Sequence, residues 1–368
     1  MKPLVAYLRS HNLLSVLYLD DFLLMDNSYL QSLHNISMTC KMLEGLGFLI
    51  NYEKSQLTPN QTVRYLGFIY DSSNMTVRLP LDKQQCITKL AKKVKRQSQC
   101  SVREFAKMIG TLVAACPAIS YGQLYTKSLE RAKYLALKNT HGNYSQIMFI
   151  PQYVREDLNW WEVHISSRKS LLPPKFVLEI FSDASLSGWG IFCGGESTHG
   201  HWNEKERSKH INFLELLAAS FGLKCFAKNL SGCCVLLRID NTTAVAYINR
   251  MGGVKHPHLH ALAKEIWQWC EERKLWIFAS YIKSSHNTEA DWESRRLSPE
   301  TEFELAPYAF RKICTFFQIP EVDLFASRNN TKCRRFFSWF RDPEAEVVDA
   351  FTVPWTDLKF YAFPPSPW

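Results

Sequence analysis

The sequence predicts a multi-domain protein of the α/β class, with α+β organisation across its parts. A chain of 368 residues is long enough for two or three domains, each with its own core. Hydrophobic residues make up 46% of it and charged residues 21%, as is typical of globular proteins. Strand-like and helix-like apolar patterns alternate, and Leu171-Leu172-Pro173-Pro174 interrupts them at the clearest domain boundary.

The first acidic motif, Tyr18-Leu19-Asp20-Asp21, lies inside an apolar run from Leu13 to Leu24. Strand-forming residues on both sides predict a β-hairpin with Asp20 and Asp21 at its tip, because ionised carboxylates are rarely buried unpaired. The pattern is consistent with a metal site and also with an acidic turn. The two aspartates alone do not distinguish between these interpretations.

A helix is predicted over 30–47, and short strands at 48–51 and 65–70 are expected to extend the hairpin. The segment 82–97 reads as a basic amphipathic helix, whose cations either face solvent or follow a phosphate backbone. Ser101 and Glu104 have the spacing of a capping box that opens another helix, and 121–168 is again helical in pattern. The cations of the basic helix are Lys89, Lys92, Lys93, Lys95 and Arg96.

After the boundary the pattern changes to strands and helices in the order βββαβαβα. The last helix begins near Glu289. The predicted strands are 177–181, 188–192, 197–202, 235–239 and 275–281, and the helices before the last are 211–230, 242–249 and 259–273.

This order places Asp183, Glu215, Asp240 and Asp291 at strand ends or on facing helix turns. A cluster of like charges needs cations, and carboxylate oxygens suit Mg²⁺ or Mn²⁺. Two such ions roughly 4 Å apart activate a water and stabilise the leaving oxygen in phosphodiester cleavage. Any one of these acids alone is more often a surface carboxylate or a helix cap.

Charge and cysteine content limit the classes of partner and location. The net charge of +9 favours an anionic partner, most readily a nucleic acid. Eleven cysteines without a repeated CxxC spacing argue against a zinc site or a disulfide framework, and favour an intracellular location, cytoplasmic or nuclear. We see no signal peptide and expect no membrane partner. The oligomeric state stays open.

Four blocks in the second half resemble the ribonuclease H family, and the Tyr-x-Asp-Asp hairpin resembles the signature of reverse transcriptases. The combination is similar, over nearly the whole chain, to the polyprotein of DIRS-type retrotransposons, which integrate with a tyrosine recombinase. The blocks are Ser182-Asp183-Ala184-Ser185 with Gly188-Trp189-Gly190, Glu215-Leu216-Leu217-Ala218, Asp240-Asn241-Thr242-Thr243-Ala244-Val245, and Asn287-Thr288-Glu289-Ala290-Asp291 with Ser294-Arg295.

The resemblance implies a partial reverse transcriptase palm over 1–80 and helices of a thumb and connection over 81–170. It implies a ribonuclease H-like domain over 175–298, with a mixed five-stranded sheet and flanking helices. Val322-Asp323-Leu324-Phe325-Ala326-Ser327 and Tyr361-Ala362-Phe363-Pro364-Pro365 resemble a methyltransferase-like region, which implies a truncated tail over 299–368.

The activity implied is two-metal hydrolysis of the RNA strand of RNA-DNA hybrids by Asp183, Glu215, Asp240 and Asp291. The alternatives are a catalytically inactive nucleic-acid-binding relic, decayed or adopted by its host, and a protein-binding module that uses Trp-rich surfaces.

The sequence departs from its templates in three places. The family's loop histidine aligns with Tyr281, which cannot shuttle a proton near neutral pH, while His286 lies nearer the final acid. Phe363 before Pro364-Pro365 and Ser366 after it depart from the base-binding motif of adenine methylases, so we expect an inactive tail.

The third departure concerns polymerisation. A palm of this kind needs another metal-binding aspartate and a nucleotide-selecting segment before the hairpin, and neither fits into 1–17. We therefore expect that this chain alone does not extend a primer. A primer-extension assay with purified protein checks this, and template-dependent incorporation would contradict it.

Overall fold

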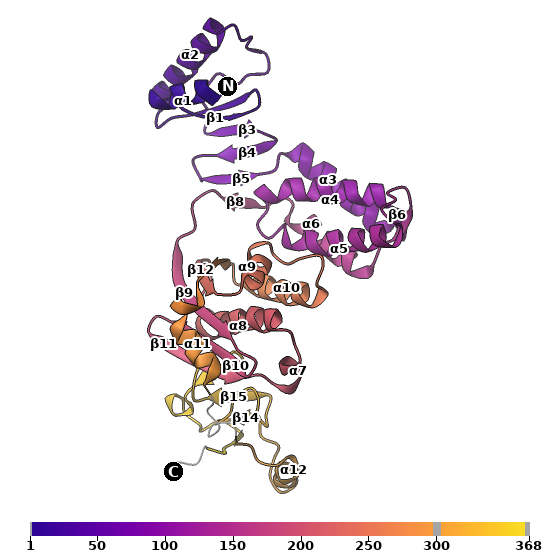
Figure 1. Ribbon diagram of the computed structural model, residues 1–368, viewed down its shortest axis with the longest axis vertical. Coiled ribbons are helices and arrows are strands. Elements are labelled where there is room, and N and C mark those ends of the chain that lie inside the picture. Colours follow the sequence, from indigo (N-terminus) through magenta and orange to yellow (C-terminus); the bar gives the residue numbers. More distant parts are fainter. Residues whose placement is uncertain (1, 297–302, 365–368) are drawn as a thin grey trace. The chain divides into compact units, whose positions relative to one another are not determined.

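The computed structural model describes residues 2–296 and 303–364 (Figure 1). The chain divides into two compact units: unit 1 comprises 1–122 and 147–172, and unit 2 comprises 123–146 and 173–368. Helices and sheets occur in both, which confirms the α/β prediction. The finer division into four domains stays a prediction. Within the described ranges, no helix has the length and apolar character needed to cross a membrane.

The first part of unit 1 contains the predicted hairpin. Tyr18 pairs with Asp21 across it, so Leu19 and Asp20 form a two-residue turn, and Leu19 has a φ of 56°. Ser28 caps the following helix by accepting a hydrogen bond from the Gln31 amide. The elements are α1 (Lys2–Ser10), β1 (Leu14–Tyr18), β2 (Asp21–Met25) and α2 (Tyr29–Gly45).

Two predicted features of this region are wrong. Residues 48–51 form no strand, and 65–70 bends back on itself because Leu66 and Gly67 both have positive φ, 46° and 75°. The resulting strands form a sheet of their own, with order β3-β4-β5-β8, instead of extending the hairpin. They are β3 (Thr62–Tyr65), β4 (Phe68–Asp71), β5 (Thr76–Arg78) and β8 (Arg168–Ser170).

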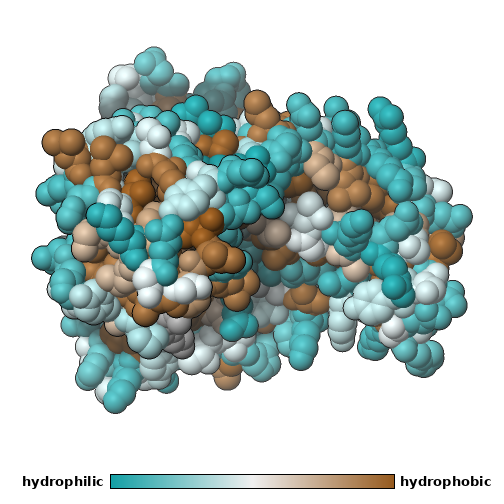
Figure 2. Space-filling model, turned by 90° about the horizontal axis from the view of Figure 1, so that it is seen from above, coloured by the Kyte–Doolittle hydropathy of each residue, from teal (hydrophilic) through white to brown (hydrophobic). Residues whose placement is uncertain are grey.

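The rest of unit 1 is mainly helical. The predicted capping box is present, since Ser101 Oγ accepts from the Glu104 amide and the Glu104 carboxylate accepts from the Ser101 amide. Apolar residues face inward, and Trp161 is fully buried. Figure 2 shows hydrophilic and hydrophobic residues intermixed on the face of the molecule that it draws. The elements are α3 (Leu81–Arg96), β6 (Gln99–Ser101), α4 (Val102–Ala115), η1 (Cys116–Ala118), β7 (Ile147–Phe149) and α6 (Gln152–His164).

Unit 2 is built on a mixed five-stranded sheet of order β11-β10-β9-β12-β13, as predicted. β10 is antiparallel to β9 and β11, whereas β12 is parallel to β9 and β13. The strands are β9 (Phe176–Ala184), β10 (Gly188–Cys193), β11 (Glu196–His201), β12 (Cys234–Ile239) and β13 (Trp276–Tyr281).

Helices cover both faces of this sheet. Gly190 lies against α11 and its neighbour Ile191 lies against α8, and successive residues of a strand face opposite sides. The first helix of unit 2, α5, joins it through hydrogen bonds from Tyr125 to Glu271 and between Ser128 and His260. The helices are α5 (Leu124–Asn139), α7 (Glu204–Arg207), α8 (Ile211–Phe226), α9 (Thr242–Asn249), α10 (Pro257–Glu272), η2 (Ser284–His286) and α11 (Thr288–Arg295).

The C-terminal segment of unit 2 forms a small parallel sheet of order β16-β15-β14-β17 around its own apolar cluster, which includes Val322 and Phe337. Pro365 and Ser366 of the methylase-like motif lie outside the described residues. The elements are α12 (Pro307–Phe316), β14 (Val322–Asp323), β15 (Arg335–Ser338), β16 (Val347–Val348), η4 (Ala350–Thr352) and β17 (Phe360–Tyr361).

The contact between β10 and α11 leaves no room for a side chain. A Cβ atom at Gly190 would lie under 3.0 Å from the Ala290 oxygen and the Ser294 nitrogen. We predict that Gly190→Ala lowers the free energy of unfolding of unit 2 by about 2–3 kcal/mol, because backbone atoms cannot move aside cheaply. Gly110→Ala, where a Cβ meets nothing within 4 Å, should not destabilise the protein. Urea unfolding checks both, and an unchanged midpoint for Gly190→Ala would contradict the packing.

Candidate metal centre

Two of the predicted acids lie side by side because their strands are parallel neighbours. Ser182 in β9 pairs with Ile239 in β12, and each strand then continues directly into an aspartate, Asp183 or Asp240. The carboxyl ends of parallel strands meet at the same edge of a sheet. Strand register alone therefore brings these carboxylates together.

The third acid reaches the same edge from helix α8. Gly222 of α8 lies so close to β9 that a Cβ there would be 2.9 Å from Ile180 Cγ2. This close approach holds α8 against the strand that ends in Asp183, with Glu215 one to two turns from the start of the helix. Ligand oxygens of Asp183, Glu215 and Asp240 lie within 4.8 Å of one another.

Burial makes this cluster costly without a counter-charge. Asp183 is 3% exposed and Glu215 is 5% exposed. Burial, followed by the charges of Asp183 and Asp240, raises the pKa of Glu215 to about 9. Burial also raises the pKa of Asp183 to about 6, against a hydrogen bond from Ser294 that lowers it.

One oxygen of the cluster is buried without a partner. Among the described residues none donates a hydrogen bond to Glu215 Oε2, whereas Asp183 Oδ2 accepts from Ser294 Oγ at 2.6 Å and Asp240 Oδ2 accepts from Ser284 Oγ at 2.6 Å. Three carboxylates around an unpartnered buried acceptor form the donor set that a hard divalent cation prefers. The residues present therefore fit the predicted metal.

The fourth predicted acid, Asp291, lies on α11 and outside the three-residue group. Its Oδ1 accepts from Arg295 Nη2 at 2.7 Å and from Arg295 Nε at 3.1 Å. Its charge nevertheless contributes to the raised pKa values of Asp183 and Glu215, so it belongs to the same electrostatic neighbourhood.

The structure adds residues to which the sequence analysis gave no role. Ser294 and Arg295 lie in a quoted block. Arg295 lies one helical turn after Asp291 and pairs with it locally, whereas the hydrogen bond from Ser294 to Asp183 depends on how α11 packs. Ser284 has no sequence signal, because it reaches Asp240 only through the turn η2. The two candidate loop residues, Tyr281 at the end of β13 and His286 in η2, are both exposed.

The remaining predicted residues lie in unit 1. Asp20 and Asp21 are exposed at the hairpin turn. On α3, Lys95 is held by Glu162 at 2.7 Å and Lys93 by Glu104 at 3.3 Å. The other members of the basic cluster, Lys89, Lys92 and Arg96, are exposed, and no ion pair to them is found among the described residues.

No protein-family model and no curated protein matches the sequence. Similar solved structures include the foamy viral protease-reverse transcriptase in complex with an RNA/DNA hybrid, at 15% identity over 82% of this chain and 40% of that chain, with a TM-score of 0.40. LC11-RNase H1 in complex with an RNA/DNA hybrid has 19% identity over 32% of this chain and 92% of that chain, with a TM-score of 0.27.

RNase H1 of the archaeon Halobacterium salinarum has 13% identity over 32% of this chain and 92% of that chain, with a TM-score of 0.27. The chain spans about half the length of the foamy viral proteins, with 48% and 40% of two of them covered. Each TM-score lies below 0.5, so the site is interpreted from its own geometry.

The buried glutamate generates a prediction about pH. Its folded-state pKa of about 9 lies above the ordinary value of 4.5, so the unfolded chain releases this proton at lower pH than the fold does. The stability of the metal-free fold therefore falls as the pH rises from about 4.5 to about 9. Glu215→Gln should therefore be more stable than the parent at pH 7, by about 1–3 kcal/mol, and equally stable at pH 4. Denaturant unfolding in EDTA at both pH values checks this. A variant less stable than the parent at pH 7 would contradict the raised pKa.

Proposed function

We propose that this chain is a ribonuclease H-type endoribonuclease that uses divalent metal ions, Mg²⁺ or Mn²⁺, to cut the RNA strand of RNA-DNA hybrids. The observation that supports this most is the buried group of Asp183, Glu215 and Asp240, with an unpartnered Glu215 oxygen and Asp291 close enough to shift the pKa values of the group. The order of the motif blocks supports the same reaction.

In the proposed reaction each residue of the candidate site would have its own role. Asp183, Glu215 and Asp240 would bind the metal, and Asp291 would complete the site once Arg295 releases it. Bound ions would supply Lewis-acid stabilisation of the negative charge that develops on the phosphate, and would make a bound water more acidic. Ser294 and Ser284 would orient the Asp183 and Asp240 carboxylates by donating to one oxygen of each and leaving the other free.

Recognition of the hybrid would depend mainly on backbone shape and on 2′-hydroxyl groups. Lys89, Lys92 and Arg96 of α3 would add sequence-independent affinity, since they are exposed and available to phosphates. Lys93 and Lys95, which are held in ion pairs, would contribute less. The order of the motifs also supports the proposal that the chain derives from a retrotransposon reverse transcriptase of the DIRS type.

A second candidate function is hybrid or nucleic-acid binding without cleavage. The ion pair between Asp291 and Arg295 favours it, because a fourth acid that stays paired with an arginine does not contribute to a metal site. The two candidates differ in whether this exposed pair opens when metal and substrate bind.

The test uses a labelled RNA-DNA hybrid with Mg²⁺, beside Asp240→Asn and the control Glu265→Gln, an exposed acid on α10. We expect cleavage by the parent and by Glu265→Gln, and a loss of about 1,000-fold in Asp240→Asn, because the metal's contribution is worth several kcal/mol. Binding without cleavage by the parent would favour the second candidate. Equal cleavage by the parent and Asp240→Asn would overturn the assignment of the site.

A further inference from the structure

Helix α11, which carries Asp291, is only eight residues long. A helix this short is not stable by itself, so contacts with the sheet fix its position and its rotation about its own axis. Some of these contacts lie at its start and on the side of the acids. Asn287 donates to the Ser182 oxygen at 3.1 Å, and Ser294 donates to Asp183 at 2.6 Å.

The opposite side of α11 is held by Glu293. Each helical residue advances about 100° around the axis, so Glu293 points roughly 200° away from Asp291. Its Oε2 lies 2.6 Å from His199 Nδ1, and its Oε1 accepts from Ser197 Oγ at 2.9 Å. The side chains of His199 and Glu293 are 9% and 8% exposed, which places their contact inside the protein.

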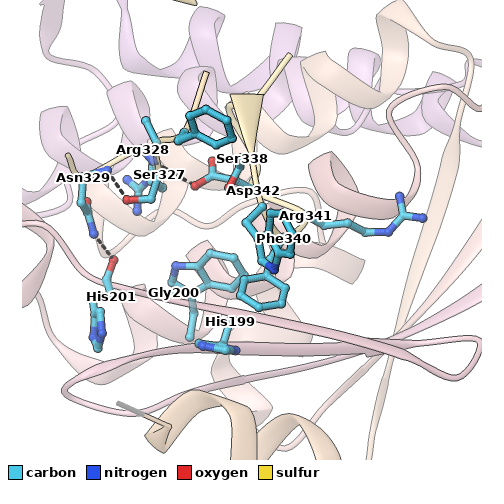
Figure 3. A pocket seen from close by; sticks show the side chains of 14 residues that line it. His199, Gly200, His201, Ser327, Arg328, Asn329, Ser338, Phe340, Arg341 and Asp342 are labelled. Atoms are coloured by element: carbon cyan, nitrogen blue, oxygen red, sulfur yellow. Dashed lines mark hydrogen bonds between the residues drawn. The ribbon is translucent and has the colours of Figure 1, made fainter. Parts of the chain in front are cut away.

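His199 and Ser197 belong to β11, an edge strand of the five-stranded sheet, which is itself held by the C-terminal segment. Thr198 Oγ1 donates to the Arg341 oxygen at 2.6 Å, and Asn329 Nδ2 donates to the His201 oxygen at 2.9 Å. Figure 3 shows His199, His201, Asn329 and Arg341 around a cavity of about 60 Å³ between β11 and the segment that contains 327–342. His199, the partner of Glu293, therefore lies on a strand that contacts α11 and is also held by the C-terminal segment.

We propose that His199 and Glu293 are positioning residues for Asp291: their buried contact sets the rotation of α11 and so aims Asp291 at the three-carboxylate group. This inference rests on the proposed function, since it concerns the same acids. In this proposal the Glu293 carboxylate and the His199 imidazole contact neither metal nor substrate. They act on Asp291 only through the position of α11.

The experiment measures Mn²⁺ affinity of the full chain by titration calorimetry, and hydrogen exchange of α11 without metal. Glu293→Ala and His199→Ala should each weaken Mn²⁺ binding about 10-fold, as is usual when a group that orients a ligand is removed, and speed exchange in α11. Glu293→Gln keeps a polar group facing His199 and Ser197, so its Mn²⁺ affinity should stay within about 2-fold of the parent.

The matched control is Glu206→Ala, which removes a partly buried ion pair of unit 2 between Glu206 of α7 and Arg328. It should lower the thermal midpoint without changing Mn²⁺ affinity. The proposal is overturned if both alanine variants at 199 and 293 bind Mn²⁺ like the parent, or if Glu206→Ala weakens binding equally. A parent that binds no Mn²⁺ would defeat the proposed function, whereas the exchange of α11 would still show whether the pair holds the helix.

Discussion

The burial of neighbouring carboxylates at one edge of the sheet is the constraint on which the candidate site of unit 2 depends. Asp183, Glu215 and Asp240 are brought together at one edge of the sheet, and two of them are almost fully buried. Burial, followed by the charges of Asp183 and Asp240, raises the pKa of Glu215 to about 9, so without a cation its protonation removes the costly buried charge. A bound divalent ion would replace that proton, so the same geometry that makes the ionised carboxylates costly would favour metal binding.

Close backbone packing makes this geometry possible. Gly222 lets α8 approach β9 on one face, and Gly188 and Gly190 let α11 approach β10 on the other. Each helix then presents an acid at the edge where β9 and β12 end. Larger residues at these glycines would move the helices by more than a metal site tolerates, because ligand positions must hold to a fraction of an ångström.

Support for the site extends well beyond the acids. Serine hydroxyls hold Asp183 and Asp240, Glu293 ties α11 to β11, and the C-terminal segment ties β11 from its other side. Segments far apart in sequence thus form one physical unit, which also includes α5 through its hydrogen bonds to α10. The C-terminal segment, which follows the five-stranded sheet in the sequence, therefore helps to hold the edge strand β11 of that sheet in place.

By itself the sequence determined the elements that local patterns encode: the alternating strands and amphipathic helices of unit 2, the hairpin turn at Asp20 and the capping box at Ser101. It failed at 48–51, where apolar residues suggested a strand that does not form, and at 65–70, where the positive φ of Leu66 and Gly67 makes a turn. Only the tertiary structure decided that Ser294 reaches Asp183, that Ser284 reaches Asp240 and that Glu293 faces His199. Local propensity acts over a few residues. These contacts join residues that are far apart in the chain, such as Glu293 and His199, and they depend on helix rotation and sheet register.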